Sequence, residues 1–410
     1  MAEVLLYRKW FKWGVFNLAI VALYGTLMRY KIAYDLPFLN QKFLLHAHSH
    51  FAFSGWLGHI FYSGIAMLLF PVINEARQKI YKGLILLNLI SSFGMLIAFT
   101  IQGYKTISIT FSTLSIVVPV LFALFYIKDS KQLSKDAAYK PWIGGALFFN
   151  VLSIFGPLTL AYLMVTKNFD NNMYRAAVYY FLHFQYNGWF FFAAVALITT
   201  LLPKNFPDIK IYFTIFLLTV IPTYFLSIMW VKIPLWLYVI TVIASIIEMG
   251  AWVSLLVRVF PILHNNQHKG ETSWVNILLY IATFAMTVKF LLQTLSVIPS
   301  LSNLVFGFRS IVIAYLHLIL LGVYSIFVLG YAFRSGILQS TNFAKYASFV
   351  FVFGVFLNES ALGIQGFAAF SYTPVPHING VLLFAALTLL LGGILLTTSQ
   401  LVAKGNNSKK

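Results

Sequence analysis

The stretch HAHSHFAFSGW, residues 46–56, places three histidines at alternate positions within a long apolar segment of the chain. An ionisable side chain in the hydrocarbon core of a bilayer costs free energy, so such residues usually serve a function there. The surrounding segment, residues 43–73, is long enough to cross a membrane as a helix. The stretch therefore indicates a functional site inside a membrane-spanning helix.

The composition of the whole chain predicts an all-α membrane protein. Hydrophobic residues make up 60% of the sequence and charged residues only 9%, whereas soluble domains have about 25% charged residues. Apolar runs of about 20 residues predict twelve transmembrane helices joined by short loops. We therefore expect one transmembrane domain, 1–410, with a short polar tail at 403–410. The predicted spans are 13–31, 43–73, 80–102, 106–127, 141–166, 174–202, 209–230, 233–260, 274–298, 303–333, 343–370 and 378–402.

Positive charge predicts the orientation of these spans. An arrangement with both termini inside places most of the Lys and Arg residues on the inner side, as the positive-inside rule expects. The net charge of +18 then reflects topology, and no basic run interleaved with aromatic residues suggests a nucleic-acid partner. We expect a multi-pass protein of a bacterial-type inner membrane, with lipids as partners and an uncleaved signal anchor at the N-terminus. The inner clusters are Arg8/Lys9/Lys12, Arg77/Lys79/Lys82, Lys128/Lys131/Lys135/Lys140 and Lys404/Lys409/Lys410.

The histidines reveal an internal repeat. Residues 50–56 read HFAFSGW, residues 183–189 read HFQYNGW and residues 317–323 read HLILLGV, so that each string has a glycine five residues after its histidine. The second string follows the first by 133 residues and the third follows the second by 134. This spacing predicts three pseudo-symmetric four-helix repeats, each with its histidine on the second helix. The glycine removes bulk where a flat cofactor or a neighbouring helix approaches. The repeats cover about 10–134, 141–270 and 272–402.

Imidazoles on facing helices are well suited to holding haem. A neutral ring nitrogen coordinates iron, and two such ligands make a six-coordinate electron carrier, although the same residues also bind copper or zinc. The chain has no cysteine, which excludes disulfides, thiolate-held metals, covalent c-type haem and iron–sulfur clusters. We interpret His264 and His268 as solvated loop residues, and His59 and His377 as satisfied or interfacial histidines.

The arrangement resembles subunit I of the haem–copper oxidase superfamily, most closely the C-family (cbb-type) oxidases and the nitric oxide reductases. LHFQYNGWFFF, residues 182–192, followed by Pro203-Lys204, is similar to the copper-ligand helix of that family, and Gly250-Ala251-Trp252 resembles another family string. The family carries His-x-His-x4-Gly-Trp in span ten, where this chain has Tyr315-Leu316-His317 with Gly322 in register.

This resemblance implies a low-spin b-type haem with His317 as one ligand. The position of the high-spin haem ligand is Tyr315, and Gln293 stands where the family has a glutamate. Pro222-Thr223-Tyr224 replaces the Pro-His-His string that supplies two copper ligands, so copper is doubtful and oxygen reduction by the family mechanism is not expected. The implied role is electron transfer from a quinol or cytochrome, or handling of nitric oxide or another diatomic gas. His183 would then hold at most a second haem or metal.

The second haem ligand is expected on span two. Distance to Gly55 favours His46, and the register of the repeat favours His50. These two lie one turn apart on one helical face, from which His48 points away. Arg309, at the outer end of span ten, is the candidate for pairing with haem propionates.

Two other interpretations remain open. The NnrS family of haem- and copper-containing membrane proteins has a similar length, a similar number of spans and a His-Ala-His string like that of residues 46–48. A transporter or channel is the alternative from another class, because Glu248, Lys289 and Glu359 fall inside spans and buried ionisable groups often line a solute or proton path. A structural pair between Lys289 and either glutamate is the simpler explanation of these charges.

Overall fold

The chain forms a bundle of membrane-spanning helices. A computed structural model describes residues 2–167, 170–203, 206, 209–265 and 273–403, and no strand occurs among them. Twelve helical segments are long and apolar enough to cross a membrane, which confirms the predicted number. They are Tyr7–Ala33, Gln41–Val72, Glu75–Gln102, Thr106–Gln132, Tyr139–Val165, Asn171–Leu201, Ile209–Ile228, Leu235–Ile262, Trp274–Leu295, Arg309–Arg334, Asn342–Phe370 and Ile378–Val402.

Several of these spans consist of more than one helix. The α-helices are α1(Ala2–Ala33), α2(Gln41–His50), α3(His59–Leu69), α4(Glu75–Gln102), α5(Thr106–Asp129), α6(Tyr139–Ser153), α7(Phe155–Val165), α8(Asn171–His183), α9(Phe191–Ile198), α10(Ile209–Thr223), α11(Leu235–Asn265), α12(Ser273–Leu295), α13(Pro299–Gly307), α14(Arg309–His317), α15(Ile326–Arg334), α16(Asn342–Phe370) and α17(Ile378–Val402). Short 3₁₀ turns follow four of them: η2(Phe70–Val72), η3(Ser130–Gln132), η5(Thr199–Leu201) and η6(Tyr224–Ile228).

Local sequence signals fix where several helices begin and end. Asn40, Asn74, Asp170 and Thr341 precede helices, and the side chain of each accepts a hydrogen bond from a backbone N–H of the first turn. Gly103 ends α4 with a φ of 63°, a conformation that favours glycine. Polar caps at the span boundaries thus keep the connections short.

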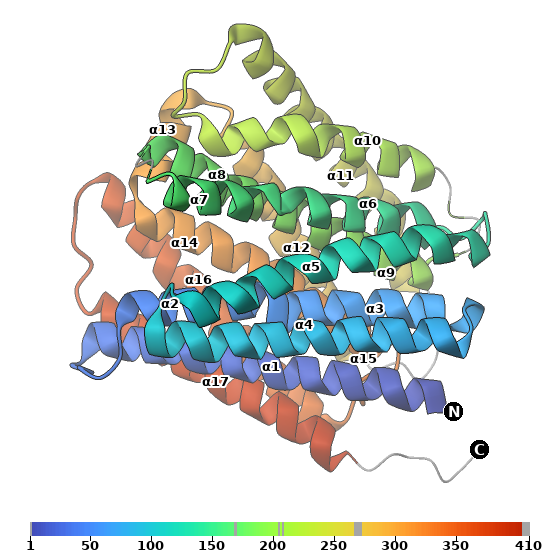
Figure 1. The fold of residues 1–410 in the computed structure, drawn as a ribbon. Coiled ribbons are helices and arrows are strands. Elements are labelled where there is room, and N and C mark those ends of the chain that lie inside the picture. Colours follow the sequence, from blue (N-terminus) through green and yellow to red (C-terminus); the bar gives the residue numbers. More distant parts are fainter. Residues whose placement is uncertain (1, 168–169, 204–205, 207–208, 266–272, 404–410) are drawn as a thin grey trace.

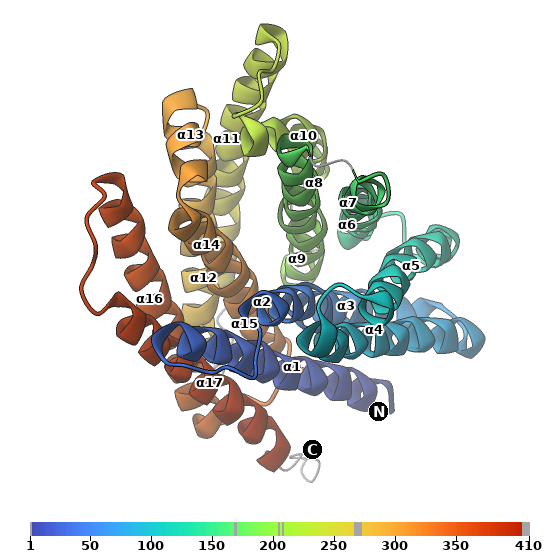
Figure 2. The same ribbon diagram turned by 60° about the vertical axis from the view of Figure 1, so that its left-hand side comes forward.

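The helices run roughly along one direction, with both termini at the same end of the bundle (Figure 1). Helix α17 packs against both α1 and α16, which brings the two ends of the chain together (Figure 2). The second and sixth spans are the most enclosed, with 78% and 83% of their apolar windows buried. The end of the bundle opposite the termini, where the second, sixth and tenth spans begin, is called the histidine end below.

The second, sixth and tenth spans meet at the centre. Trp56 donates a hydrogen bond from Nε1 to Ser325 Oγ at 2.8 Å, which joins span two to span ten. Tyr324 donates its hydroxyl to the carbonyl of Tyr186, which joins span ten to span six. Hydrogen bonds inside the bundle therefore join the three histidine-bearing spans to one another.

Each of these three spans contains a π-helical segment that starts directly after its repeat histidine. The segments are η1(Phe51–Gly58) after His50, η4(Phe184–Phe190) after His183 and η7(Leu318–Ser325) after His317. π-Helical turns are rare and are often found at functional sites. The local backbone therefore repeats at the three positions that the sequence spacing singled out.

Candidate functional site

His48 faces α1 and the tenth span. Its Nδ1 lies 3.1 Å from the carbonyl oxygen of Val21. Gly25, one turn further along α1, lies against the same ring, since a Cβ there would stand 3.5 Å from His48 Cε1, an ordinary contact distance. His48 also interacts electrostatically with His317 and with Arg29, so three spans converge at this point.

His317 has the same hydrogen-bonding arrangement as His48. Its Nδ1 lies 2.8 Å from the carbonyl oxygen of Ile313, one turn earlier in α14. A carbonyl only accepts hydrogen bonds, so Nδ1 carries the proton in both rings and the lone pair resides on Nε2. A metal-ligating histidine is commonly oriented in this way. Both side chains are half-buried, and Arg29 interacts electrostatically with His317 as well.

Protein atoms do not enclose α14. No residue of this helix is buried, although the rest of the same span, η7 and α15, is largely buried. Every residue of α14 therefore keeps some accessible surface. A bulky non-protein group next to His317 fits this pattern, since protein interiors are otherwise closely packed.

His46 and His50 lie on the other face of α2, against α4 and the turn after it. His50 Nε2 is 3.2 Å from the hydroxyl of Tyr104, and the His50 ring stacks on Phe99 with 4.7 Å between centroids. The His46 ring meets the Tyr104 ring edge-on, also at 4.7 Å. His46, favoured as a haem ligand by its distance to Gly55, and His50, favoured by the repeat register, thus point toward α4. His48 is the span-two imidazole within electrostatic reach of His317.

His183 does not have the free nitrogen that a metal ligand needs. Its Nε2 lies 2.7 Å from the carbonyl oxygen of Val220, and its Nδ1 accepts from the Asn187 amide at 3.0 Å. The side chain is only 1% exposed. Within the described ranges, no group of three or more His, Cys, Asp and Glu residues is arranged to hold a metal ion. These donors do not fit a copper ion or a second haem at His183.

Glu248 and Lys289 are connected through Gln293 in a fully buried chain of hydrogen bonds. Lys289 Nζ donates to Gln293 Oε1 at 2.7 Å, and Gln293 Nε2 donates to Glu248 Oε2 at 2.8 Å. The three side chains are 2%, 7% and 1% exposed, in the order Lys289, Gln293, Glu248. Thr223 also hydrogen-bonds to Glu248, so this triad joins α10, α11 and α12. The expected pairing of Lys289 with a glutamate is therefore bridged by an amide.

The other candidates lie apart from these two clusters. Glu359 is half-buried in α16 and accepts a hydrogen bond from Asn358 at 3.0 Å. Arg309 is exposed at the start of α14, and His377 is exposed before α17. His59 is buried in the core, where its Nε2 lies 2.9 Å from the Trp10 carbonyl oxygen. Six residues named from sequence fall where the structure does not describe their side chains: Lys204, His264, His268, Lys404, Lys409 and Lys410.

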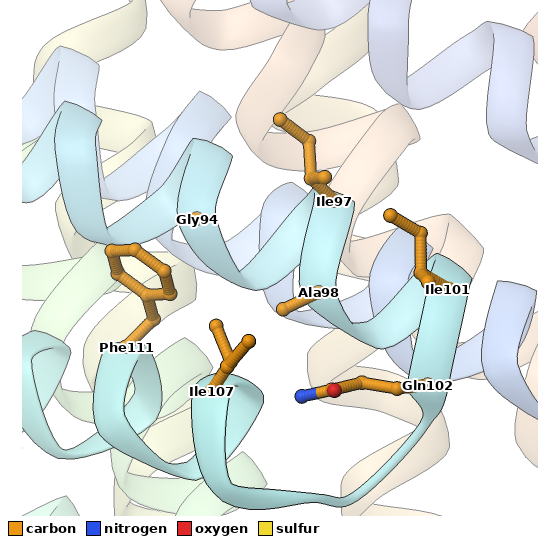
Figure 3. Close-up of a pocket in the computed structure, with 7 residues that line it drawn as sticks. All are labelled: Gly94, Ile97, Ala98, Ile101, Gln102, Ile107 and Phe111. Atoms are coloured by element: carbon orange, nitrogen blue, oxygen red, sulfur yellow. The ribbon is translucent and has the colours of Figure 1, made fainter.

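Two crevices on the outside of the bundle do not contain these candidates. One, of about 240 Å³, lies between α4 and α5 and is almost wholly apolar (Figure 3). The other, of about 360 Å³, lies between α10 and α11. Ile101 of the first crevice is 75% exposed, which places that crevice on the lipid-facing surface. The first crevice is lined by Gly94, Ile97, Ala98, Ile101, Gln102, Ile107 and Phe111.

Sequence reasoning did not identify Arg29 and Tyr104 as members of the clusters. Arg29 is a cation near the end of an otherwise apolar span. A charge at such a position usually has a partner within the membrane, so the sequence does contain a signal for Arg29. Tyr104 sits in a loop, where tyrosine commonly anchors a helix at the membrane interface. Comparison of the chain with protein-family models and with curated proteins finds no match in either case.

Proposed function

We propose that the protein binds one b-type haem between His48 and His317 and acts as an intramembrane electron carrier. The observation that carries this proposal is the matched pair of imidazoles, each with Nδ1 held by a backbone carbonyl and Nε2 left for iron. The incomplete burial of α14 and the closeness of the two rings, which lie within electrostatic reach of each other, support it. The resemblance to oxidase subunit I supplies the expectation of haem.

The protein would contribute ligands, orientation and charge. The carbonyls of Val21 and Ile313 fix both rings in one tautomer, which keeps the coordinating nitrogens unprotonated. Arg29 is the cation suited to a haem propionate, because it interacts with both histidines, whereas Arg309 is exposed. When bound, haem supplies one-electron redox chemistry.

Two axial histidines favour electron transfer over gas binding. A diatomic gas needs an open coordination position, and a bis-histidine iron has none. The donors at His183 do not fit a second metal, and the family mechanism of oxygen reduction needs one. We propose a quinol or a cytochrome as the electron donor.

The same proposal includes the symmetry and orientation of the chain. The π-helical segments after His50, His183 and His317 support three related four-helix repeats. The distribution of Lys and Arg supports an orientation with both termini in the cytoplasm of a bacterial-type cell. The histidine end would then lie at the outer face of the inner membrane.

The test is a reduced-minus-oxidised spectrum of the purified protein, with pyridine-haemochrome quantification. We expect one b-type haem per chain in the wild type, and loss of the low-spin spectrum in His48→Gln and His317→Gln. His46→Gln and His50→Gln should retain it, because those rings face α4. Protein from a haem-sufficient host with no Soret band would refute the proposal, and loss of haem in His46→Gln alone would refute the choice of ligand.

Transport is the second candidate function, and the Glu248–Gln293–Lys289 triad is the observation that favours it. Buried ionisable residues in membrane proteins often mark proton or ion pathways. On α11, Ser245 precedes Glu248 by one turn and contacts Thr294 of α12 at 3.5 Å, which extends the polar contacts between these two helices. Proteoliposomes loaded with a pH-sensitive dye would test this function. A proton flux that Glu248→Gln abolishes, in protein without haem, would favour transport over electron transfer.

A further inference from the structure

The two faces of α2 have different chemical surroundings. His48 points toward α1 and His317, whereas His46 and His50 lie one turn apart on the opposite side. This second pair is not used in the proposed haem site. Its rings contact the same two aromatic side chains, Phe99 and Tyr104, so they share one small pocket of the bundle.

His46 has an unsatisfied polar atom in this pocket. Its Nε2 is shielded from solvent and has no hydrogen-bond partner. A buried nitrogen without a partner typically costs about 1–3 kcal/mol, so a ligand at this atom would remove an existing penalty. His50 Nε2 has only the hydroxyl of Tyr104, at 3.2 Å. This contact is long and is the single hydrogen bond of that nitrogen among the described residues, so a ligand could replace it.

We infer that His46 and His50 together bind one univalent transition-metal ion, Cu⁺, at the histidine end of the bundle. Imidazole nitrogen is a good ligand for copper, and histidines four residues apart on a helix present their rings to the same side. In this proposal Cu⁺ takes His46 Nε2 as one ligand and His50 Nε2 as the other, with the Tyr104 hydroxyl displaced from His50.

The charges around the pair favour a univalent ion over Zn²⁺ or Cu²⁺. Lys42, one turn before His46, interacts with it electrostatically and repels cations. Among the described residues, no carboxylate joins the pair to form a metal-binding group of three. A divalent ion in this setting would have uncompensated charge next to aromatic rings, and burying such charge is costly. A two-coordinate Cu⁺ brings half of that charge and needs only the two nitrogens present.

The pocket can be reached from the end of the bundle. Tyr104 lies between α4 and α5, in the turn at the histidine end, and is 44% exposed. Its hydroxyl contacts His50, so the tyrosine covers the pair on the side that faces the turn. Rotation of this one side chain would admit an ion without movement of the helices.

Competition for Cu⁺ with the chromogenic chelator bicinchoninate, under reducing conditions, tests the inference on full-length purified protein. Wild-type protein should withdraw one equivalent of Cu⁺, and His46→Gln and His50→Gln should each weaken binding at least tenfold. His48→Gln is the matched control from the same helix and should bind Cu⁺ like the wild type. Tyr104→Phe should bind as tightly or more tightly, because it removes the competing hydrogen bond to His50.

Haem content is measured on the same samples, which separates this inference from the proposed function. The expected pattern is reciprocal: His48→Gln loses haem and keeps Cu⁺, whereas His46→Gln and His50→Gln lose Cu⁺ and keep haem. Wild-type protein that withdraws no Cu⁺, or equal binding by the wild type and the His46→Gln/His50→Gln double variant, would overturn the copper site whatever the haem content. Retained haem in the His46 and His50 variants shows that they fold. If haem is absent from all samples, monodisperse elution in gel filtration serves that purpose.

Discussion

Replacing Lys289 with methionine should destabilise the bundle strongly. The ammonium donates to Gln293 Oε1 at 2.7 Å and interacts electrostatically with Glu248. Methionine has a similar length but no charge, so Lys289→Met leaves the carboxylate of Glu248 buried without its counter-charge. Removing one partner of a buried ion pair typically costs about 3–5 kcal/mol. We expect a loss of this size in the free energy of unfolding.

A double-mutant cycle makes this prediction specific to the triad. Glu248→Gln alone should cost a similar amount, because it leaves the ammonium of Lys289 uncompensated. The double variant removes both charges and keeps, at position 248, an amide oxygen that can accept the hydrogen bond from Gln293 Nε2. It should therefore be more stable than either single variant, since replacing both members of a buried pair with neutral groups is often nearly neutral.

Reversible unfolding of the purified protein in mixed detergent micelles, followed by tryptophan fluorescence, measures these differences. Lys79→Met is the matched control, because Lys79 is exposed and should change stability by no more than about 0.5 kcal/mol. If the loss of stability in the double variant equals the sum of the losses in the single variants, the two charges do not compensate each other. Single variants as stable as Lys79→Met would refute the buried pairing itself.

Three further predictions concern packing, an ion pair and pH. Gly188→Ala should lower the free energy of unfolding by about 1–3 kcal/mol in the same assay, because the new Cβ would stand 2.4 Å from the Cβ of Phe149. Unchanged stability would contradict the close contact of α6 with span six. Asp129→Asn should lower the free energy of unfolding by about 1.5–3 kcal/mol, because it weakens two charge-assisted hydrogen bonds from Arg77 at 2.9 Å. Equal stability of this variant and the wild type would contradict a stabilising ion pair. Burial raises the pKa of Tyr104 to about 12, from about 10 in an unfolded chain, so its contribution to stability is complete below pH 10 and is lost as pH rises through 12. Tyr104→Phe should therefore show a smaller fall in stability between pH 10 and 12 than the wild type, and identical alkaline profiles would count against that shift.

Hydrophobicity was sufficient to predict the number of spans, because a helix that crosses a bilayer needs a long apolar run. The start of span ten was predicted at residue 303, but the span begins at Arg309 and is preceded by the separate helix α13. Pro299 starts α13 at a position where proline is favoured, and the extended backbone of Phe308 separates it from α14. A continuous apolar stretch does not show such a break.

The histidine cluster was predicted only in part. Helical periodicity correctly separated His46 and His50 from His48, because residues two apart on a helix point to different sides. It did not indicate which side would face span ten, since rotation of α2 about its own axis is set by packing against α1 and α4. The π-helical segments have no simple compositional signal either. The repeat of histidine and glycine located them, but the backbone geometry had to come from the structure.

On the proposed function, the polar cluster around His183 favours transfer of electrons to a partner. His183 has both ring nitrogens engaged and interacts electrostatically with Lys289, whose own charge is held by Gln293 and Glu248. His183 therefore presents no free ring nitrogen to a substrate or metal. On the proposed function, an electron that reaches the haem has no acceptor at this cluster, so it must leave to another protein or to a quinone. The chain would then work as one step of an electron-transfer route whose terminal reaction takes place elsewhere.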